Sequence, residues 1–116
     1  MHKPIIYGIK NCDTMKKARA FLDAKGVAYD FHDYKTQGAP EAKLKAWAKE
    51  VGWEKLLNKA GTTFRKLPEA KKEGITEARA IALMLAEPSM IKRPVLEAKG
   101  RVLVGFDPKL YAEIAG

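Results

Sequence analysis

The spacing of apolar residues predicts a strand, a helix and a second strand in the first third of the chain. The run "PIIYG", residues 4–8, is typical of a short buried strand that ends at a glycine. Residues 13–25 carry apolar side chains at helical spacing, with Asp13 or Thr14 available as a cap and Gly26 as a stop. Residues 27–34, "VAYDFHDY", alternate apolar and polar side chains as a strand does. Together these elements indicate a βαβ unit.

The pattern changes to helical spacing over about 40–90 and then returns to strands. Leu44, Trp47, Ala48 and Val51 follow the spacing of a helix, and Thr76 can cap a second helix that ends before Pro88, with shorter helical pieces between the two. Two strands follow, "RPVLE" at 93–97 and "RVLVGF" at 101–106, joined by a turn at 98–100. Asp107 and Pro108 begin a closing helix. The order predicts one α/β domain over 1–116, a small mixed sheet with an all-helical insertion at about 40–90.

Composition narrows the class of protein without identifying an activity. The chain has 116 residues and a net charge of +8, from 22 basic and 14 acidic side chains. Basic and acidic residues are interspersed, and no aromatic and basic motif accompanies them, so we do not expect nucleic-acid binding. No apolar run is long enough to span a membrane. A single cysteine favours a reducing compartment, and we expect a cytoplasmic protein.

That cysteine, Cys12, lies between the first predicted strand and the first predicted helix, in "YGIKNCDTMKKA". Unpaired backbone N–H groups at a helix start favour an anion, and such a position lowers the pKa of a thiol. Lys10, Lys16 and Lys17 add positive charge nearby in the sequence. The position therefore favours a reactive thiolate over an inert buried cysteine. No metal site is expected, because His2 and His32 are far apart and lack ligand spacing.

Four segments occur in order, "YGIKNCDTMKKA", "GTTFRKL", "IKRPVL" and "VGFDPKLY". This constellation resembles the arsenate reductase-like family of thioredoxin-fold proteins, which contains ArsC, Spx and YffB, and it is nearest to the YffB branch. The resemblance implies a thioredoxin-like (glutaredoxin-like) four-stranded sheet with the helical block inserted, and a nucleophilic cysteine at Cys12. It also implies that Arg65 and Arg93 bind an oxyanion or a thiol-linked intermediate, and that Pro94 is a cis-proline facing the active-site loop.

Two departures from the family pattern guide the expected chemistry. Met15 stands where a CxxC pair would have its second cysteine, so a catalytic cycle needs an external thiol. Glutathione is the expected cosubstrate, with no bound cofactor, because Arg93, Lys10 or Arg65 could pair with its carboxylates. We include Asn11 and Thr14, which flank Cys12, in the expected anion- or glutathione-binding set. The third arginine of the family's arsenate reductases has no clear counterpart, since Arg101 follows a turn.

Three functions follow from this interpretation. The leading hypothesis is a glutathione-dependent thiol–disulfide oxidoreductase in which Cys12 forms a mixed disulfide that a second thiol resolves. Its partner is glutathione or another small thiol, and a glutaredoxin is a candidate protein partner. The alternatives are an arsenate reductase proper, and a non-enzymatic Spx-like transcription regulator that binds RNA polymerase.

Overall fold

The computed structural model describes residues 3–115 and divides the chain into two compact units. Residues 1–37 and 93–116 form one, which we call the sheet unit, and residues 38–92 form the other, the helical unit. The helical unit contains the segment of about 40–90 in which the sequence predicts an insertion. Each unit is described by itself below.

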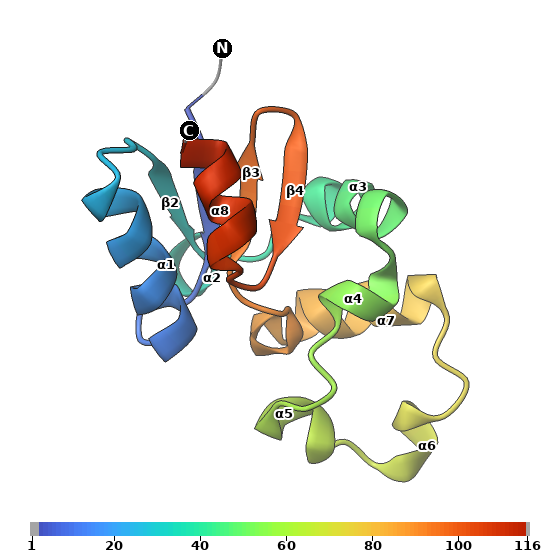
Figure 1. Ribbon diagram of the computed structural model, residues 1–116. Coiled ribbons are helices and arrows are strands. Elements are labelled where there is room, and N and C mark those ends of the chain that lie inside the picture. The colour runs from blue at the N-terminus through green and yellow to red at the C-terminus, as the bar shows by residue number, and fades with distance from the viewer. Residues whose placement is uncertain (1–2, 116) are drawn as a thin grey trace. The chain divides into compact units, whose positions relative to one another are not determined.

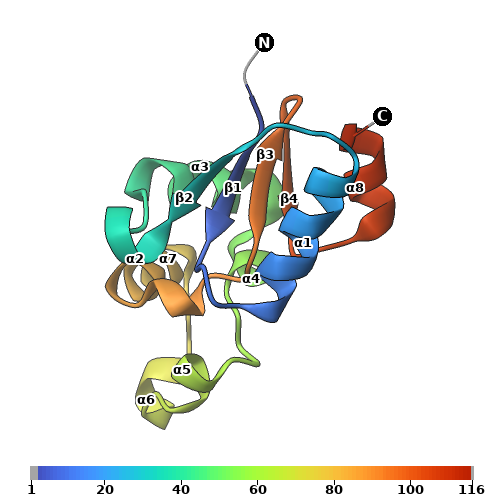
Figure 2. The same ribbon diagram turned by 90° about the vertical axis from the view of Figure 1, so that its left-hand side faces the viewer.

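The sheet unit is built on four short strands, shown in Figure 2. Their spatial order is β2-β1-β3-β4, in which β1 and β2 are parallel and β3 is antiparallel to both β1 and β4. The bounds are β1 Ile5–Gly8, β2 Asp30–Asp33, β3 Val95–Ala98 and β4 Arg101–Val104. This mixed sheet confirms the α/β, thioredoxin-like class that was expected from the sequence.

Two helices, α1 (Asp13–Ala24) and α8 (Pro108–Ala115), share one core with the sheet. Figure 1 shows α8 against the sheet and α1 beside it. α8 begins as expected, because the Asp107 carboxylate accepts a hydrogen bond from the Lys109 N–H at 2.9 Å. The core consists of buried side chains from both helices and three strands: Ile6, Met15, Ala18, Leu22, Leu96, Ala98, Leu103, Tyr111 and Ile114.

A different group of side chains lies on the opposite face of the sheet. Strand register places Tyr7, His32 and Glu97 on this face, because side chains alternate along each strand and Ile6 and Leu96 point into the core. The Tyr7 hydroxyl donates a hydrogen bond to the Glu97 carboxylate at 2.7 Å. The rings of Tyr7 and His32 lie 5.1 Å apart. This face is therefore polar as well as aromatic.

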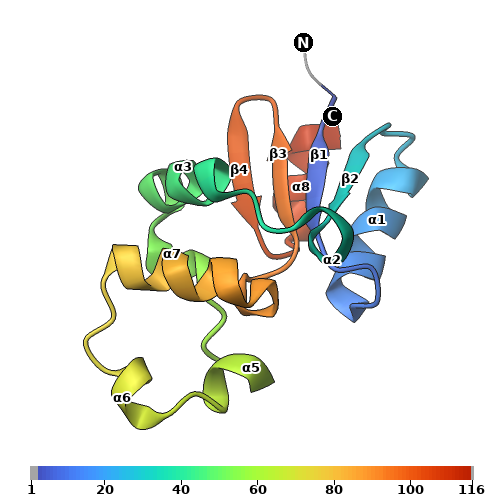
Figure 3. The same cartoon turned by 180° about the vertical axis from the view of Figure 1, so that it is seen from behind.

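The second strand is shorter than the sequence predicts, and a helical turn, α2 (Tyr34–Gln37), takes its last residue. The strand ends at Asp33 because its carboxylate accepts from the Lys35 N–H at 2.9 Å and so turns the backbone. The Gln37 side chain returns a contact by accepting from the Asp33 N–H at 3.2 Å. Figure 3 shows α2 at the end of β2. Tyr34 thus begins a helix, where we expected the end of a strand.

The helical unit follows the expected pattern. Thr76 caps α7 as expected, accepting from the Arg79 N–H at 3.3 Å. Leu44, Trp47, Leu56 and Met84 are buried. Its elements are α3 Glu41–Val51, α4 Trp53–Leu56, α5 Thr62–Arg65, α6 Glu69–Lys72, α7 Glu77–Ala86 and the 3₁₀ turn η1 Pro88–Met90.

Neither a membrane-spanning helix nor a cluster of potential metal ligands occurs among the residues that the structure describes. Among residues 3–115, none of the helices has the length and apolar character that crossing a membrane requires. In the same residues, no three His, Cys, Asp or Glu side chains gather in a way that could hold a metal ion. His2 lies outside the described residues.

Candidate active site

Cys12 occupies the N-cap position of α1, with an extended backbone (φ −136°, ψ 130°). The sequence offered Asp13 or Thr14 as the cap, but the helix begins one residue earlier, at Asp13. The carbonyl oxygen of Cys12 accepts the first helical hydrogen bond, from the Lys16 N–H at 2.9 Å. The cysteine is therefore part of the helix terminus itself, where N–H groups lack partners within the helix.

The pKa of the Cys12 thiol is lowered from its ordinary value by a balance of opposing effects. Partial burial is the largest single effect and raises the pKa, because it penalises the charged form. It is outweighed by the backbone N–H groups of Met15 and Thr14 at the start of α1 and by the guanidinium of Arg93, all of which favour the negatively charged thiolate. The thiolate is the nucleophilic form, so the site favours the reactive state.

Arg93 is brought to Cys12 by the strand order. Val95, the first residue of β3, pairs with Tyr7 near the end of β1 from which the chain continues toward Cys12. The Arg93–Pro94 peptide bond is cis, as the resemblance implies, and the Pro94 carbonyl accepts from the Gly105 N–H at 2.8 Å. Pro94 is buried and Arg93 is partly exposed. The segment before β3 thus carries a guanidinium beside a thiol that is in a different part of the sequence.

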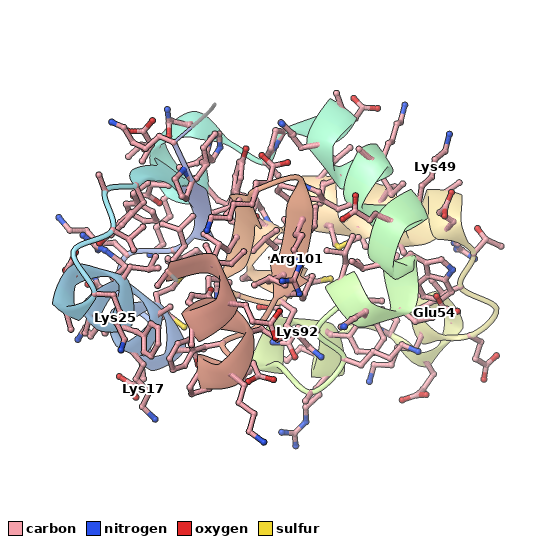
Figure 4. All side chains as sticks on the ribbon, turned by 45° about the horizontal axis from the view of Figure 1, so that its top comes forward. Lys17, Lys25, Lys49, Glu54, Lys92 and Arg101 are labelled. Atoms are coloured by element: carbon pink, nitrogen blue, oxygen red, sulfur yellow. The ribbon has the colours of Figure 1, made fainter. Side chains whose placement is uncertain are left out.

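The other residues expected around Cys12 differ in their effect on the pKa of its thiol. Thr14 takes part through its backbone N–H. Lys10 and Asn11 lie in the loop before the helix and are exposed. Lys17, labelled in Figure 4, is also exposed on α1. The positive charge that lowers the thiol pKa comes from Arg93, whereas the sequence had pointed to the neighbouring lysines.

Met15 occupies the position at which a CxxC pair would have its second cysteine, and its side chain has a packing role there. Its side chain is completely buried in the core and packs against Gly8, where an added Cβ would collide with the Met15 sulfur and methyl group. The position serves packing of α1 on β1. Cys12 is the chain's one cysteine and is free, so no disulfide can form within the chain.

Arg65 belongs to the helical unit, while the other expected site residues belong to the sheet unit. It is the last residue of α5 and is exposed. α5 is linked to η1 by a hydrogen bond between the hydroxyls of Thr63 and Ser89, at 2.8 Å. A role for Arg65 at Cys12 stays a prediction. The helical unit also has a groove of about 350 Å³ between α3 and α7, and no expected site residue lines it.

Arg101 lies at the other end of the β3–β4 hairpin from Arg93. It pairs with Ala98, three residues along β3 from Val95, which is about 10 Å at the usual rise per strand residue. Its guanidinium contacts the Glu113 carboxylate of α8 at 2.8 Å. Arg101 is labelled in Figure 4. Arg101 is therefore engaged elsewhere and is not a third arginine of the Cys12 site.

Sequence reasoning missed one residue near Arg93. Tyr34 is 3% exposed, and its hydroxyl has no hydrogen-bond partner among residues 3–115. Burial raises the pKa of this hydroxyl, the neighbouring Tyr7 and Glu97 raise it further, and the positive charge of Arg93 lowers it. The signal available in the sequence was only a tyrosine at the end of a predicted strand.

The arrangement supports nucleophilic attack by a thiolate on an electrophile whose anionic group Arg93 can bind. Two backbone N–H groups and one guanidinium stabilise negative charge on the sulfur, both before attack and when the thiolate is regenerated. A guanidinium presents several donors in a plane, which suits a carboxylate or an oxyanion.

Comparison with known proteins places this site in a family. A model of the ArsC family matches residues 7–114, a range that includes Cys12 and Arg93. Among solved structures, the chain is similar to a YffB protein at 60% identity, with a TM-score of 0.95 and coverage of 98% of this chain and 100% of that one. It is also similar to an arsenate reductase (ArsC) related protein from Brucella melitensis, at 55% identity, with a TM-score of 0.77 and coverage of 97% and 93%.

A regulator is among the curated relatives. The global transcriptional regulator Spx of Streptococcus agalactiae is 27% identical over 99 residues, which are 84% of this chain and 72% of that protein. The relatives thus include proteins named for arsenate reduction and a protein named for transcriptional control.

Proposed function

Because this chain belongs to the ArsC family, with the family model matching residues 7–114, we propose that it is a glutathione-dependent thiol–disulfide oxidoreductase with a single nucleophilic cysteine. The observation that carries the proposal is the lowered pKa of the Cys12 thiol at the start of α1, with Arg93 beside it and no second cysteine in the chain.

The cycle has two exchange steps. The Cys12 thiolate attacks the glutathione sulfur of a disulfide R–S–SG, which forms Cys12–S–SG and expels RS⁻. The thiolate of a second glutathione then attacks the glutathione sulfur of this mixed disulfide, which releases oxidised glutathione and regenerates the Cys12 thiolate. Overall, R–S–SG is reduced to the thiol and two glutathione units leave as the disulfide. An external thiol resolves the intermediate because the chain holds one cysteine.

Arg93 has two tasks in this cycle. It stabilises the Cys12 thiolate before attack and again as the leaving group of the second step. It also offers donors to a glutathione carboxylate, and Lys10, exposed in the preceding loop, adds a second positive charge for the same ligand. Asn11 and the start of α1 at Thr14 complete the proposed binding surface in the sheet unit.

Intact-mass measurement after incubation with oxidised glutathione tests the proposal. We expect one glutathione adduct on the wild-type chain and none on Cys12→Ser, and the adduct should disappear when reduced glutathione is added. A wild-type chain that stays unmodified while its thiol is freely alkylated would refute glutathione as the cosubstrate.

The similarity to Spx supports a second candidate, a regulator that binds another protein without catalysis. The two candidates differ in their need for Cys12. A Cys12→Ser chain that kept its full biological activity would favour the regulator, whereas loss of activity together with loss of the adduct would favour the enzyme.

A further inference from the structure

A groove in the helical unit exposes apolar side chains of α7. It has a volume of about 350 Å³ and runs between α3 and α7. Its apolar lining comes from α7 alone and consists of Ala78, Ile81, Ala82 and Leu85. Ala78 and Ala82 are exposed, and Leu85 is half-buried. An apolar helix face normally packs against another element, and such a patch on a surface is typical of an interaction site.

The other wall of the groove is a row of charged side chains on α3. Glu41, Lys45 and Lys49 follow one another at intervals of one helical turn, so they lie on the same side of α3. Glu41 and Lys45 pair with each other at 3.2 Å. Lys49 forms no ion pair within residues 3–115, and neither does Glu77, which lines the groove from the first turn of α7.

The two helices run in opposite directions, as Figures 1 and 3 show. Lys49, near the end of α3, therefore lies at the end of the groove where α7 begins, and Glu41 lies at the end where Leu85 is found. Glu77 shares the first of these ends, but its carboxylate is already favoured by the N-terminus of its own helix. Lys49 is therefore available to a carboxylate that a partner brings to this end.

The apolar side chains of α7 complement themselves when two copies of the helix lie antiparallel. In one register of such a pair, Ala78 faces Leu85 of the second copy and Ile81 faces Ala82 of the second copy. Symmetry repeats both pairs with the copies exchanged. Each pair joins a small side chain to a large one, which allows both surfaces to interdigitate. An interface between two identical subunits requires this property, because the same patch must fit itself.

We propose that this groove is an interface between two copies of the chain, in which α7 of each copy lies antiparallel to α7 of the other, in the other's groove. The charges agree with this register, which brings Glu87 of the second copy to the end of the groove that Lys49 occupies. Glu87 directly follows α7, is exposed and forms no ion pair within residues 3–115. Symmetry forms the Lys49–Glu87 pair twice. The inference goes beyond the proposed function and does not depend on Cys12.

Sedimentation equilibrium of the full chain tests the interface. Protein concentrations up to about 1 mM should show a reversible monomer–dimer equilibrium, because an interface built on one pair of helices is small. Ala82→Glu should raise the dissociation constant of the dimer by roughly tenfold or more, because it places a carboxylate of each copy among apolar side chains. Ala20→Glu is the matched control, since it makes the same change at an exposed position of α1, outside the groove. It should leave the dissociation constant unchanged, and thermal unfolding verifies that both variants fold.

Two further sets of variants test the register. Lys49→Glu and Glu87→Lys should each raise the dissociation constant by roughly three- to tenfold, and the double variant should return it toward the wild-type value, because the exchanged charges attract again. In a Cys12→Ser chain, Ala82→Cys should form a disulfide-linked dimer under mild oxidation, because Ala82 lies beside the symmetry axis of the proposed pair. Ala20→Cys in the same chain should form it much more slowly.

Three outcomes would overturn the inference. A chain that stays monomeric at every concentration would leave the groove to a different protein or to a small apolar ligand. A dimer that Ala82→Glu and Ala20→Glu weaken equally, or not at all, would use another surface. Failure of the double charge variant to restore association, together with equal cross-linking of Ala82→Cys and Ala20→Cys, would rule out the antiparallel register. Glutathione exchange at Cys12 is measured separately, so its presence or absence leaves these results unaffected.

Discussion

Replacing Arg93 by alanine is the most direct perturbation of the Cys12 site. The substitution removes the guanidinium that acts on the thiol as donor and as charge, while the N–H groups of Met15 and Thr14 remain. Arg93 is partly exposed and precedes β3, so the core of the sheet unit keeps all its side chains. The expected result is a functional loss with little change in Tm.

The size of the loss follows from the kind of interaction removed. A hydrogen bond to a charged group contributes about 1.5–3 kcal/mol, which is roughly a 10- to 100-fold change in rate or equilibrium constant. We expect a decrease of this order in kcat/KM for glutathione exchange at Cys12. Arg93→Lys should recover part of it, because an ammonium keeps the charge but lacks the planar set of donors.

The assay combines exchange kinetics with alkylation of Cys12 as a function of pH. The alkylation midpoint of Arg93→Ala should move to higher pH, because the variant loses a group that favours the thiolate. Arg101→Ala is the matched control: it removes an arginine from the same hairpin, at the end away from Val95, where it contacts Glu113. That variant should leave exchange and midpoint unchanged. If Arg93→Ala matched Arg101→Ala in both measurements, Arg93 would have no part in the site.

Three further predictions concern stability and substrate choice. Because the pKa of Cys12 is lower in the native state, the unfolded chain keeps the thiol proton to a higher pH. The stability of wild type relative to Cys12→Ser should therefore increase with pH up to about 8.5 and be lost as pH falls through the native pKa. Urea unfolding across this pH range would measure the difference in stability, and a difference that did not change with pH would contradict the prediction. Gly8→Ala should reduce the free energy of unfolding by about 1–3 kcal/mol, because the added Cβ collides with Met15. The double variant Gly8→Ala, Met15→Ala should lose less free energy of unfolding than the sum of the two single losses, and additive losses would argue against that contact. Arsenate reduction with glutathione and glutaredoxin should be weak, because Arg101 is paired with Glu113, and robust turnover would overturn that argument.

Much of the secondary structure in both units could be predicted because its elements carry local signals. The alternation and spacing around Met15, the Asp107–Pro108 start of α8 and the Thr76 cap of α7 each depend on residues within a few positions. The predicted second strand ran one residue too far at its end, to Tyr34, because Asp33 can continue a strand or start a turn. The hydrogen bond from Lys35 decides the matter, and it is a property of the folded backbone.

The charges around Cys12 show where local reasoning fails. Lys10 and Lys16 are close to Cys12 in sequence, yet both are exposed, and a flexible lysine in water contributes little to a thiol pKa. Arg93 is 81 positions away in sequence and acts on the thiol because β3 lies next to β1. The order of the strands therefore determines which positively charged side chain lowers the pKa of the Cys12 thiol.

Two buried tyrosines, Tyr34 and Tyr111, also differ in surroundings that the local sequence does not indicate. In the sequence, Tyr34 ends a predicted strand and Tyr111 lies in a predicted helix, and neither position shows what its hydroxyl meets in the fold. The fold places Tyr111 among apolar side chains of the core and Tyr34 within the influence of Arg93 and Glu97. A hydroxyl without a partner lowers stability wherever it is buried, so packing alone would favour phenylalanine at both positions. The sequence shows two tyrosines, and only the fold shows that charged groups act on the hydroxyl of one of them.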